Sequence, residues 1–271
     1  MTEKSVFEIV GCQRQLFLDQ HGVERIENLY QTMHQPSKKG AVIRPDVMSG
    51  NPVYQIRSAP MWDEEEDLFK LVLCSPYIAY YQSSDGLHWT LSDHSSNHTP
   101  EPMLQAKYTV RDPKDADRSC RFKGLATLPN GLQPLASHDA AHWHKLDVPV
   151  ISTHDETNIS YDSIKDQFIV TGRCSELYYD PSAVQGGYSC RGTQYGRSVF
   201  MYTSQDFRTW SNPGKLIFHA DELDQSMGRH IIDERFSDPT LEQPIYNTPI
   251  IYKVDVYNMG VFRYESRYLG M

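Results

Sequence analysis

The chain has 271 residues, enough for one large β domain or two ordinary domains, and its composition is that of a globular protein. Its 26 lysines and arginines against 35 aspartates and glutamates give a net charge of −9, and it has no basic run, so we expect no nucleic-acid partner. No apolar run approaches the ~18 residues of a membrane-spanning helix, so we expect no membrane partner either.

The N-terminus and the cysteines indicate in which cellular compartment the protein is expected. Residues 1–4 lack the apolar stretch of a signal peptide, which predicts a soluble, cytoplasmic protein, or a secreted one if a signal peptide has been removed. The five cysteines are scattered, and no pair has metal-site spacing. We expect reduced thiols, with a Cys174–Cys190 disulfide as the alternative in an exported protein.

Residues 1–50 are interpreted as a leading segment and residues 51–98 as a first β unit. In the leading segment Leu16–Leu18 is strand-like, and Asp19 stands at its C-terminal end. The first unit has three apolar runs typical of strands, at Ile56–Trp62, Leu68–Cys74 and Tyr77–Gln82. An acidic run, Asp63–Asp67, follows the first of them, and we expect it to be a turn facing water.

The first unit ends in a motif that occurs three times. Each copy has a Ser two residues before an Asp and a Trp four residues after it, at Ser83–Trp89, Ser137–Trp143 and Ser204–Trp210. An Asp in such a turn can accept hydrogen bonds from the backbone N–H groups two and three residues on. The Trp can pack its ring between neighbouring sheets and bond its indole N–H there. The motif therefore predicts repeated turns in β units, and it places no catalytic residue.

Two further units and a partial one follow. The second, residues 99–155, has expected strands at Arg121–Leu128 and Leu132–Ala136 around a turn at Pro129–Gly131. The third, residues 156–240, has expected strands at Ile159–Tyr161, Gln167–Arg173 and Ser198–Thr203. It also holds a long insert, Ser175–Tyr195, of the kind that often forms a functional loop. Residues 241–271 form a partial unit, with expected strands at Ile245–Tyr252 and Val256–Phe262.

Repeated β units with the same turn predict an all-β fold, a β-propeller of four-stranded antiparallel blades in a single domain, 1–271. Closing such a ring takes about four blades or more, and the last unit is short. An incomplete or open arc, a longer chain, and strands supplied by residues 1–50 are the alternatives.

Several short motifs in a fixed order resemble those of one family. They are Leu16-Phe17-Leu18-Asp19, Ser83–Trp89, Arg121-Phe122-Lys123-Gly124-Leu125, Asp155-Glu156-Thr157-Asn158 with Tyr161-Asp162, Gly196-Arg197-Ser198 with Ser204–Trp210, and Tyr246-Asn247 with Pro249. Their order is similar to that of the glycoside-hydrolase-like five-bladed β-propeller proteins, relatives of invertase- and arabinanase-type enzymes. The chain resembles a shortened member, because the family's chains carry more blade sequence than follows here.

The resemblance implies an axial funnel with three carboxylates, a nucleophile or base, a stabiliser and an acid. Glycosidic cleavage needs a proton donor on the leaving oxygen and a second carboxylate across the sugar ring. Asp19 matches the first inner strand and is the candidate base or nucleophile, with a structural turn as the alternative. Asp155 and Glu156 open the third unit, and strand alternation would send them to opposite faces. We favour Asp155, which is in phase with Thr157, and a polar interblade loop is the alternative.

In the second unit, cations stand where the stabilising Asp is expected. Arg121 and Lys123 are in phase on one face, and Arg173 and Arg197 are candidates to join them. Such cations would bind a carboxylate or sulfate on a sugar, and pairing with surface acids is the alternative. The remaining expected substrate-positioning residues are Asn158 and Tyr246.

No metal or cofactor is expected. His142 and His144 share a face, but no third ligand is near in sequence, and no nucleotide-binding or nucleophile-elbow signature occurs. The sequence therefore predicts a carbohydrate-active protein, a glycosidase acting on an oligo- or polysaccharide that is neutral or anionic. A non-catalytic carbohydrate-binding or protein-interaction propeller is the alternative, and a homo-oligomer is a further one.

Overall fold

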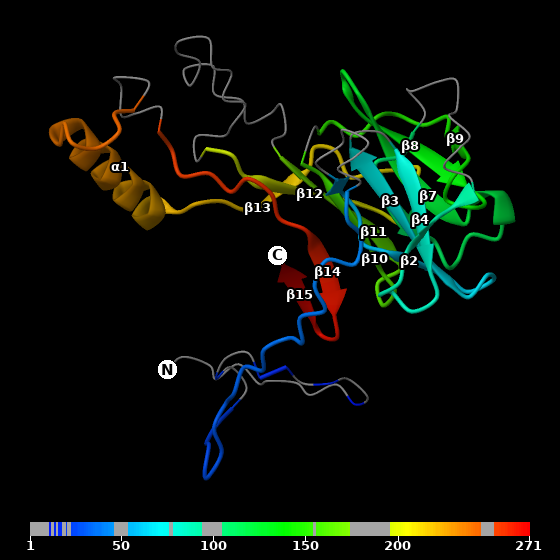
Figure 1. Ribbon diagram of the computed structural model, residues 1–271, viewed down its shortest axis with the longest axis horizontal. Helices are drawn as coiled ribbons and strands as arrows, with labels where there is room; N and C mark the ends of the chain where they lie inside the picture. Colours follow the sequence, from blue (N-terminus) through cyan, green and yellow to red (C-terminus); the bar gives the residue numbers. More distant parts are fainter. Residues whose placement is uncertain are drawn as a thin grey trace, which may run out of the picture.

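The computed structural model describes residues 11, 14, 16–17, 20, 23–45, 54–75, 78–93, 105–153, 156–173, 196–244 and 252–271. In these ranges the chain forms three antiparallel sheets, a β hairpin, one α-helix and a short 3-10 helix at Arg118–Cys120 (Figure 1). The insert Ser175–Tyr195 and the predicted strand Ile245–Tyr252 lie outside them, but for residue 252. No helix in this part of the chain is long and apolar enough to cross a bilayer.

Blade 1, residues 54–93, has an interrupted inner strand. Its strands are β1 (Gln55–Ile56), β2 (Met61–Asp63), β3 (Leu68–Ser75), β4 (Ala79–Ser83) and β5 (Thr90–Leu91). Both β1 and β2 pair antiparallel with β3, whereas the sequence predicted an unbroken strand over Ile56–Trp62. Pro60 lacks the N–H that a strand ladder needs. Ser58 turns instead to the next sheet, where its hydroxyl accepts the Thr109 N–H at 2.6 Å.

Blade 2, residues 105–145, and blade 3, residues 158–218, are four-stranded antiparallel sheets in chain order. The strands of blade 2 are β6 (Tyr108–Arg111), β7 (Phe122–Leu128), β8 (Gly131–Ser137) and β9 (Trp143–Lys145). Those of blade 3 are β10 (Asn158–Asp162), β11 (Gln167–Arg173), β12 (Val199–Ser204) and β13 (Lys215–Phe218). A hairpin of β14 (Val261–Tyr264) and β15 (Arg267–Gly270) follows. The long buried strands β3, β7, β8, β11 and β12 lie close to their predicted positions, whereas β14 only overlaps the predicted Val256–Phe262.

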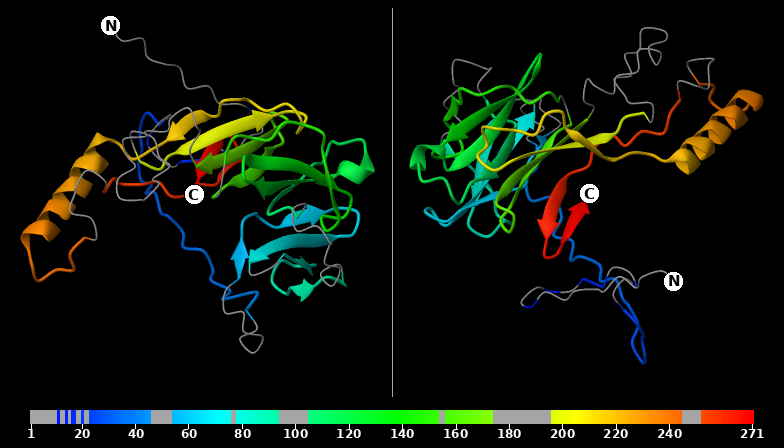
Figure 2. Two further views of the ribbon diagram at one scale, coloured as in Figure 1. Left: turned by 90° about the horizontal axis from the view of Figure 1, so that it is seen from above. Right: turned by 180° about the vertical axis from the view of Figure 1, so that it is seen from behind.

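The inner strands β2, β6, β10 and β14 lie side by side in that order. The strand β10 runs alongside the segment that ends in β14, because Asn158 bonds Asn258, the Ser160 hydroxyl donates to Val261 O at 2.6 Å, and the Asp162 carboxylate lies 3.6 Å from the Arg263 guanidinium. The strands β10 and β14 therefore run in the same direction, and the sheets fan out from the inner strands, as the left view of Figure 2 shows. The prediction of a mostly β, propeller-type fold with four-stranded antiparallel blades is confirmed, and the five-bladed type and the closure of the ring stay predictions.

The three Ser–Asp–Trp turns close as predicted. Asp85 Oδ1 accepts the N–H groups of Leu87 and His88, both at 2.8 Å, and Asp139 and Asp206 do the same two and three residues on. The residue after each Asp has a positive φ, which is 72° at Gly86, 66° at Ala140 and 58° at Phe207. The local geometry is thus the same in all three blades.

The tryptophans of these turns agree with the prediction in part. Trp143 packs against Met61 of blade 1 and Phe122 of blade 2, between two sheets as expected. The indole N–H of Trp89 donates to Gly86 O at 3.0 Å. The indole N–H of Trp210 is buried and has no partner among the described residues, so the expected hydrogen bond is not general.

The helix α1 (Glu222–Ser237) was not predicted and projects away from the sheets (Figures 1 and 2). It begins with a capping box, in which the Asp221 side chain accepts backbone N–H groups and the Asp224 side chain accepts the Asp221 N–H. Its buried residue Gln225 binds both backbone groups of Val254, at 2.9 and 3.0 Å. The helix is therefore joined to the segment that leads into β14.

Candidate functional site

The C-terminal ends of three inner strands carry an Asp that the sequence analysis did not recognise as a repeat. Asp63, Asp112 and Asp162 each accept the backbone N–H two residues on, at 3.0–3.1 Å. All three are buried. The acidic run at residue 63 was expected to face water, and this is wrong for Asp63, whose side chain is 0% exposed.

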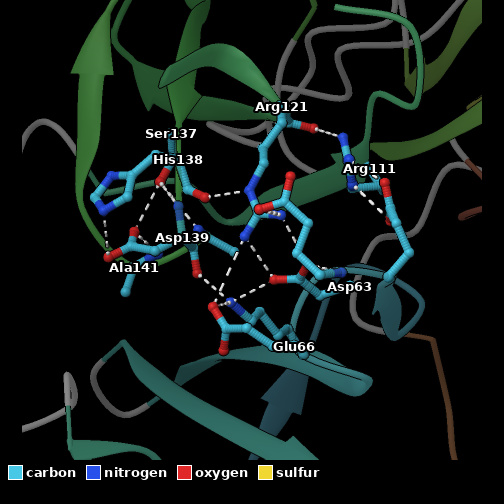
Figure 3. Close-up of polar contacts among 12 residues, drawn as sticks. Asp63, Glu66, Arg111, Arg121, Ser137, His138, Asp139 and Ala141 are labelled. Atoms are coloured by element: carbon cyan, nitrogen blue, oxygen red, sulfur yellow. Dashed lines mark hydrogen bonds and ion pairs between the residues drawn. The ribbon is translucent and has the colours of Figure 1, made fainter. Parts of the chain in front are cut away.

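Arg121 holds the Asp63 carboxylate in a bidentate ion pair, with both N–O distances 2.8 Å (Figure 3). Lys70 Nζ lies 2.7 Å from the same carboxylate, and the Arg121 Nε donates to His138 O at 2.5 Å. Burial opposes ionisation of Asp63, but its bonds and charge attraction to Lys70 outweigh that effect and lower its pKa. Arg121 therefore joins blade 2 to blade 1 as a structural ion pair.

Lys123 is buried in the same manner. Its side chain is 3% exposed, and its Nζ lies 3.2 Å from Asp112 and forms a shorter ion pair with Asp115. It also donates to Cys120 O at 2.6 Å. Arg121 and Lys123 thus pair with acids, which was the alternative to substrate binding, and they lie at the C-terminal ends of the inner strands.

The N-terminal ends of the inner strands meet around Glu156. This residue precedes β10, is 7% exposed, and forms an ion pair with Arg57 from the break between β1 and β2. Asn258, which precedes β14, donates to the same Glu156 Oε2 at 3.4 Å and accepts the Asn158 amide at 2.5 Å. Arg57, Glu156, Asn158 and Asn258, here called the Glu156 cluster, come from three different units of the fold.

Glu156 has a strained backbone, with φ at +61°. Residues other than glycine rarely adopt this left-handed conformation, and such strain gathers at functional sites. Both described bonds go to Oε2, so Oε1 makes no hydrogen bond with the described residues. A buried carboxylate with one open oxygen can accept a hydroxyl or exchange a proton with a ligand.

Two arginines lie beside the Glu156 cluster, on the ring of Tyr257. Arg197 is 4.8 Å and Arg173 is 5.9 Å from the ring centroid. Asp255 accepts the Arg197 backbone N–H at 2.7 Å, and its carboxylate lies 3.5 Å from the Arg197 Nε. A Cβ at Gly196, where φ is +83°, would approach Asp255 Oδ1 to 2.6 Å, so glycine allows this close approach.

The structure thus separates the predicted site residues. It brings together Glu156, Asn158, Arg173 and Arg197, and it places Arg121 and Lys123 at the opposite strand ends. Asp19, Asp155 and Tyr246 lie outside the described residues. The sequence reasoning missed Arg57, Asp255, Tyr257 and Asn258. One signal was present, because Tyr257-Asn258 lies shortly before β14 and Thr157-Asn158 stands at the start of β10. Within the described ranges, no group of three His, Cys, Asp or Glu residues is placed to hold a metal ion.

Comparison with known proteins gives likeness in structure alone. No family model and no curated protein sequence matches the chain. A fructofuranosidase from Schwanniomyces occidentalis, solved with fructosylnystose, is 12% identical with a TM-score of 0.41, and the match covers 64% of this chain and 35% of that one. A GH32 β-fructofuranosidase from Bombyx mori is 12% identical with a TM-score of 0.37, over 64% of this chain and 36% of that one. A GH43 protein from Bacteroides ovatus is 14% identical with a TM-score of 0.26, over 63% and 42%. Matches at these values assign no activity.

Proposed function

We propose that the chain is a carbohydrate-active protein that binds an oligosaccharide at the N-terminal ends of its inner strands. The observation that carries the proposal is Glu156, a buried carboxylate with a left-handed backbone whose Oε1 makes no hydrogen bond with the described residues. The neighbouring amides of Asn158 and Asn258 and the ring of Tyr257 are groups that suit sugar hydroxyls and sugar faces.

The proposed activity is hydrolysis of a glycosidic bond. Glu156 would be one of the two carboxylates that the reaction requires, acting as acid or base on the leaving oxygen or the attacking water. The proposed second carboxylate is either Asp155, its neighbour in sequence, or Asp19. The ion pair with Arg57 would hold the Glu156 side chain in place during the reaction.

The test is a screen for release of reducing ends from neutral and anionic plant and algal glycans, followed by Glu156→Gln. Gln keeps the shape and still accepts the Arg57 bond, but it can neither donate nor take up the proton. We expect activity to fall about 100-fold or more in this variant, since acid–base groups contribute roughly 10²–10⁴-fold. Glu234→Gln on the exposed face of α1 is the matched control.

Equal turnover in wild type and Glu156→Gln would remove Glu156 from the mechanism. Asp155→Asn and Asp19→Asn, assayed beside it, would then decide whether either carboxylate contributes.

The second candidate is carbohydrate binding without turnover. It is favoured by one observation, that Glu156 is the one carboxylate of the Glu156 cluster among the described residues, whereas cleavage needs two. Calorimetric binding of an oligosaccharide with no product after long incubation would support this candidate, and hydrolysis that depends on Asp155 would exclude it.

A further inference from the structure

Arg173 and Arg197 form an arginine pair whose charge the described residues balance only in part. Arg57 is paired with Glu156, and Arg197 with Asp255. The Arg173 guanidinium contacts the Tyr257 ring but makes no hydrogen bond or ion pair with any described residue. The described part of this end of the strands therefore carries three guanidinium groups against two carboxylates.

The arginine pair lies next to the Glu156 cluster. Asn158 pairs with Thr171 in the β10–β11 ladder, and Arg173 lies two residues beyond Thr171 at the same end of β11. Tyr257 precedes Asn258 in the chain, and Asn258 bonds both Glu156 and Asn158. A ligand on the Glu156 cluster is therefore within reach of the arginine pair.

The arginine pair is also held in position without a ligand. Arg197 is fixed through its backbone N–H and its Nε by Asp255, and its carbonyl accepts the Val256 N–H at 3.0 Å. Stacking on an aromatic ring uses the flat face of a guanidinium and leaves its N–H edge free. That edge donates two parallel hydrogen bonds to a carboxylate, sulfate or phosphate.

We propose that Arg173 and Arg197 bind an oxyanion, carried as a carboxylate or sulfate substituent on the oligosaccharide that occupies the Glu156 cluster. The inference rests on the proposed function, because it assumes that a sugar binds there. An anion would offset the repulsion between two cations that share one ring, so binding would favour charged glycans over their neutral forms.

The test compares charged and neutral forms of the same glycans by calorimetry. The probes are tetragalacturonate with its methyl ester, a sulfated carrageenan oligosaccharide with its desulfated form, and inorganic sulfate and phosphate. We expect one charged form to bind at least about tenfold more tightly than its neutral form, with affinity that falls as salt is added. Arg173→Gln and Arg197→Gln should each lose about tenfold for the charged form alone.

Two controls separate charge from fold. Arg208→Gln changes the charge equally in the exposed turn of blade 3 and should bind all probes as the wild type does. Arg173→Lys keeps the charge but cannot donate two parallel hydrogen bonds to one oxyanion, so this variant should bind the charged form with intermediate affinity. Melting temperatures of all variants identify any that fail to fold.

The outcomes separate this inference from the proposed function. Equal affinity for charged and neutral forms, or unchanged binding in the double variant Arg173→Gln/Arg197→Gln, would overturn the oxyanion site while the proposed function stands. Binding of inorganic sulfate or phosphate that depends on both arginines, with no glycan bound, would support the anion site and count against the proposed function. Absence of binding by every probe would overturn both.

Discussion

Arg121 and Arg173 are both arginines at the ends of strands in the middle of a blade, yet their surroundings give them different roles. Arg121 is 7% exposed and bonds Asp63 with both ends of its guanidinium. The Arg173 guanidinium lies over the Tyr257 ring, 5.9 Å from its centroid, and has no ion pair with a described residue. A saturated, buried cation holds two blades together, whereas a cation with free donors remains available to a ligand.

Arg121→Met is expected to destabilise the protein by about 3–5 kcal/mol, because it removes the bidentate partner of the buried Asp63 carboxylate. Urea denaturation measures the change. Arg118→Met, on an exposed arginine of the same turn, should cost less than about 1 kcal/mol. An Arg121→Met variant as stable as the wild type would show that Lys70 alone neutralises Asp63.

Asp206 is expected to contribute to acid sensitivity. Burial opposes its ionisation, but the N–H groups of Thr209 and Arg208 and the Ser204 hydroxyl outweigh that effect and lower the pKa of Asp206 to about 2. Its stabilising contribution is complete above the unfolded-state pKa of about 3.9 and is lost as pH falls toward 2.

Asp206→Asn keeps an acceptor for the backbone N–H groups but does not titrate. We therefore expect the wild type to lose more stability than this variant between about pH 4 and pH 2, with the two stability curves converging at the acid end. Urea midpoints at a series of pH values measure this, with Asp233→Asn on the exposed face of α1 as the control. Parallel curves would contradict the assignment.

At the scale of elements, the sequence predicted the long buried strands but not the short exposed strands or the helix. The runs that became β7, β8 and β11 are long, apolar and buried, so their pattern is strong. The outer strands β5, β9 and β13 are two to four residues long and largely exposed, so their patterns are weak. The helix α1 carries exposed Leu223, Met227 and Ile231 four residues apart. Its capping box was the local sequence feature that indicated a helix.

The hairpin β14–β15 is held to blade 3 by side chains of β10 and β11. Tyr268 donates its hydroxyl to Asp162 at 2.5 Å, and the Thr171 hydroxyl donates to Met259 O at 2.8 Å. Burial opposes ionisation of Asp162, and the bond from Tyr268 contributes most to keeping its pKa low. Tyr268 thus connects the last element to the third sheet.

Tyr268→Phe is expected to loosen this hairpin by about 1–2 kcal/mol, because a buried carboxylate loses a donor. Amide hydrogen exchange in β14 and β15 should then be roughly 5- to 30-fold faster, while exchange in blade 2 stays unchanged. Tyr264→Phe, on a tyrosine that is 43% exposed, is the control. Equal exchange in the hairpin would mean that its backbone contacts with blade 3 are sufficient.

At the scale of the whole molecule, the repeat predicted the propeller because its defining contacts are local. The Asp–N–H bonds of the turns span two or three residues, so each copy reports its own geometry in the sequence. The contacts between blades are different in kind. Arg121 and Asp63 are 58 positions apart, and their pairing depends on how two sheets pack.

The residues of the candidate site also divide into those that local sequence motifs indicated and those that only the packing of the blades brings together. Glu156, Asn158, Arg173 and Arg197 belong to the third unit, and motifs within that unit pointed to them. Arg57 and Asn258 reach Glu156 from other units, 99 and 102 positions away, and no sequence pattern links such distant places before the blades are assembled. The sequence therefore supplied one side of the site, and the assembly of blades supplied the other.

The two ends of the inner strands differ in how much change they tolerate. One end is fastened by the buried carboxylates of Asp63, Asp112 and Asp162, each with partners that cannot be exchanged singly at low cost. The other end holds Arg173 and Tyr257, and among the described residues Arg173 forms no ion pair that its replacement would break. New ligand preferences can therefore be selected at one end by mutagenesis, while the other end keeps the blades assembled.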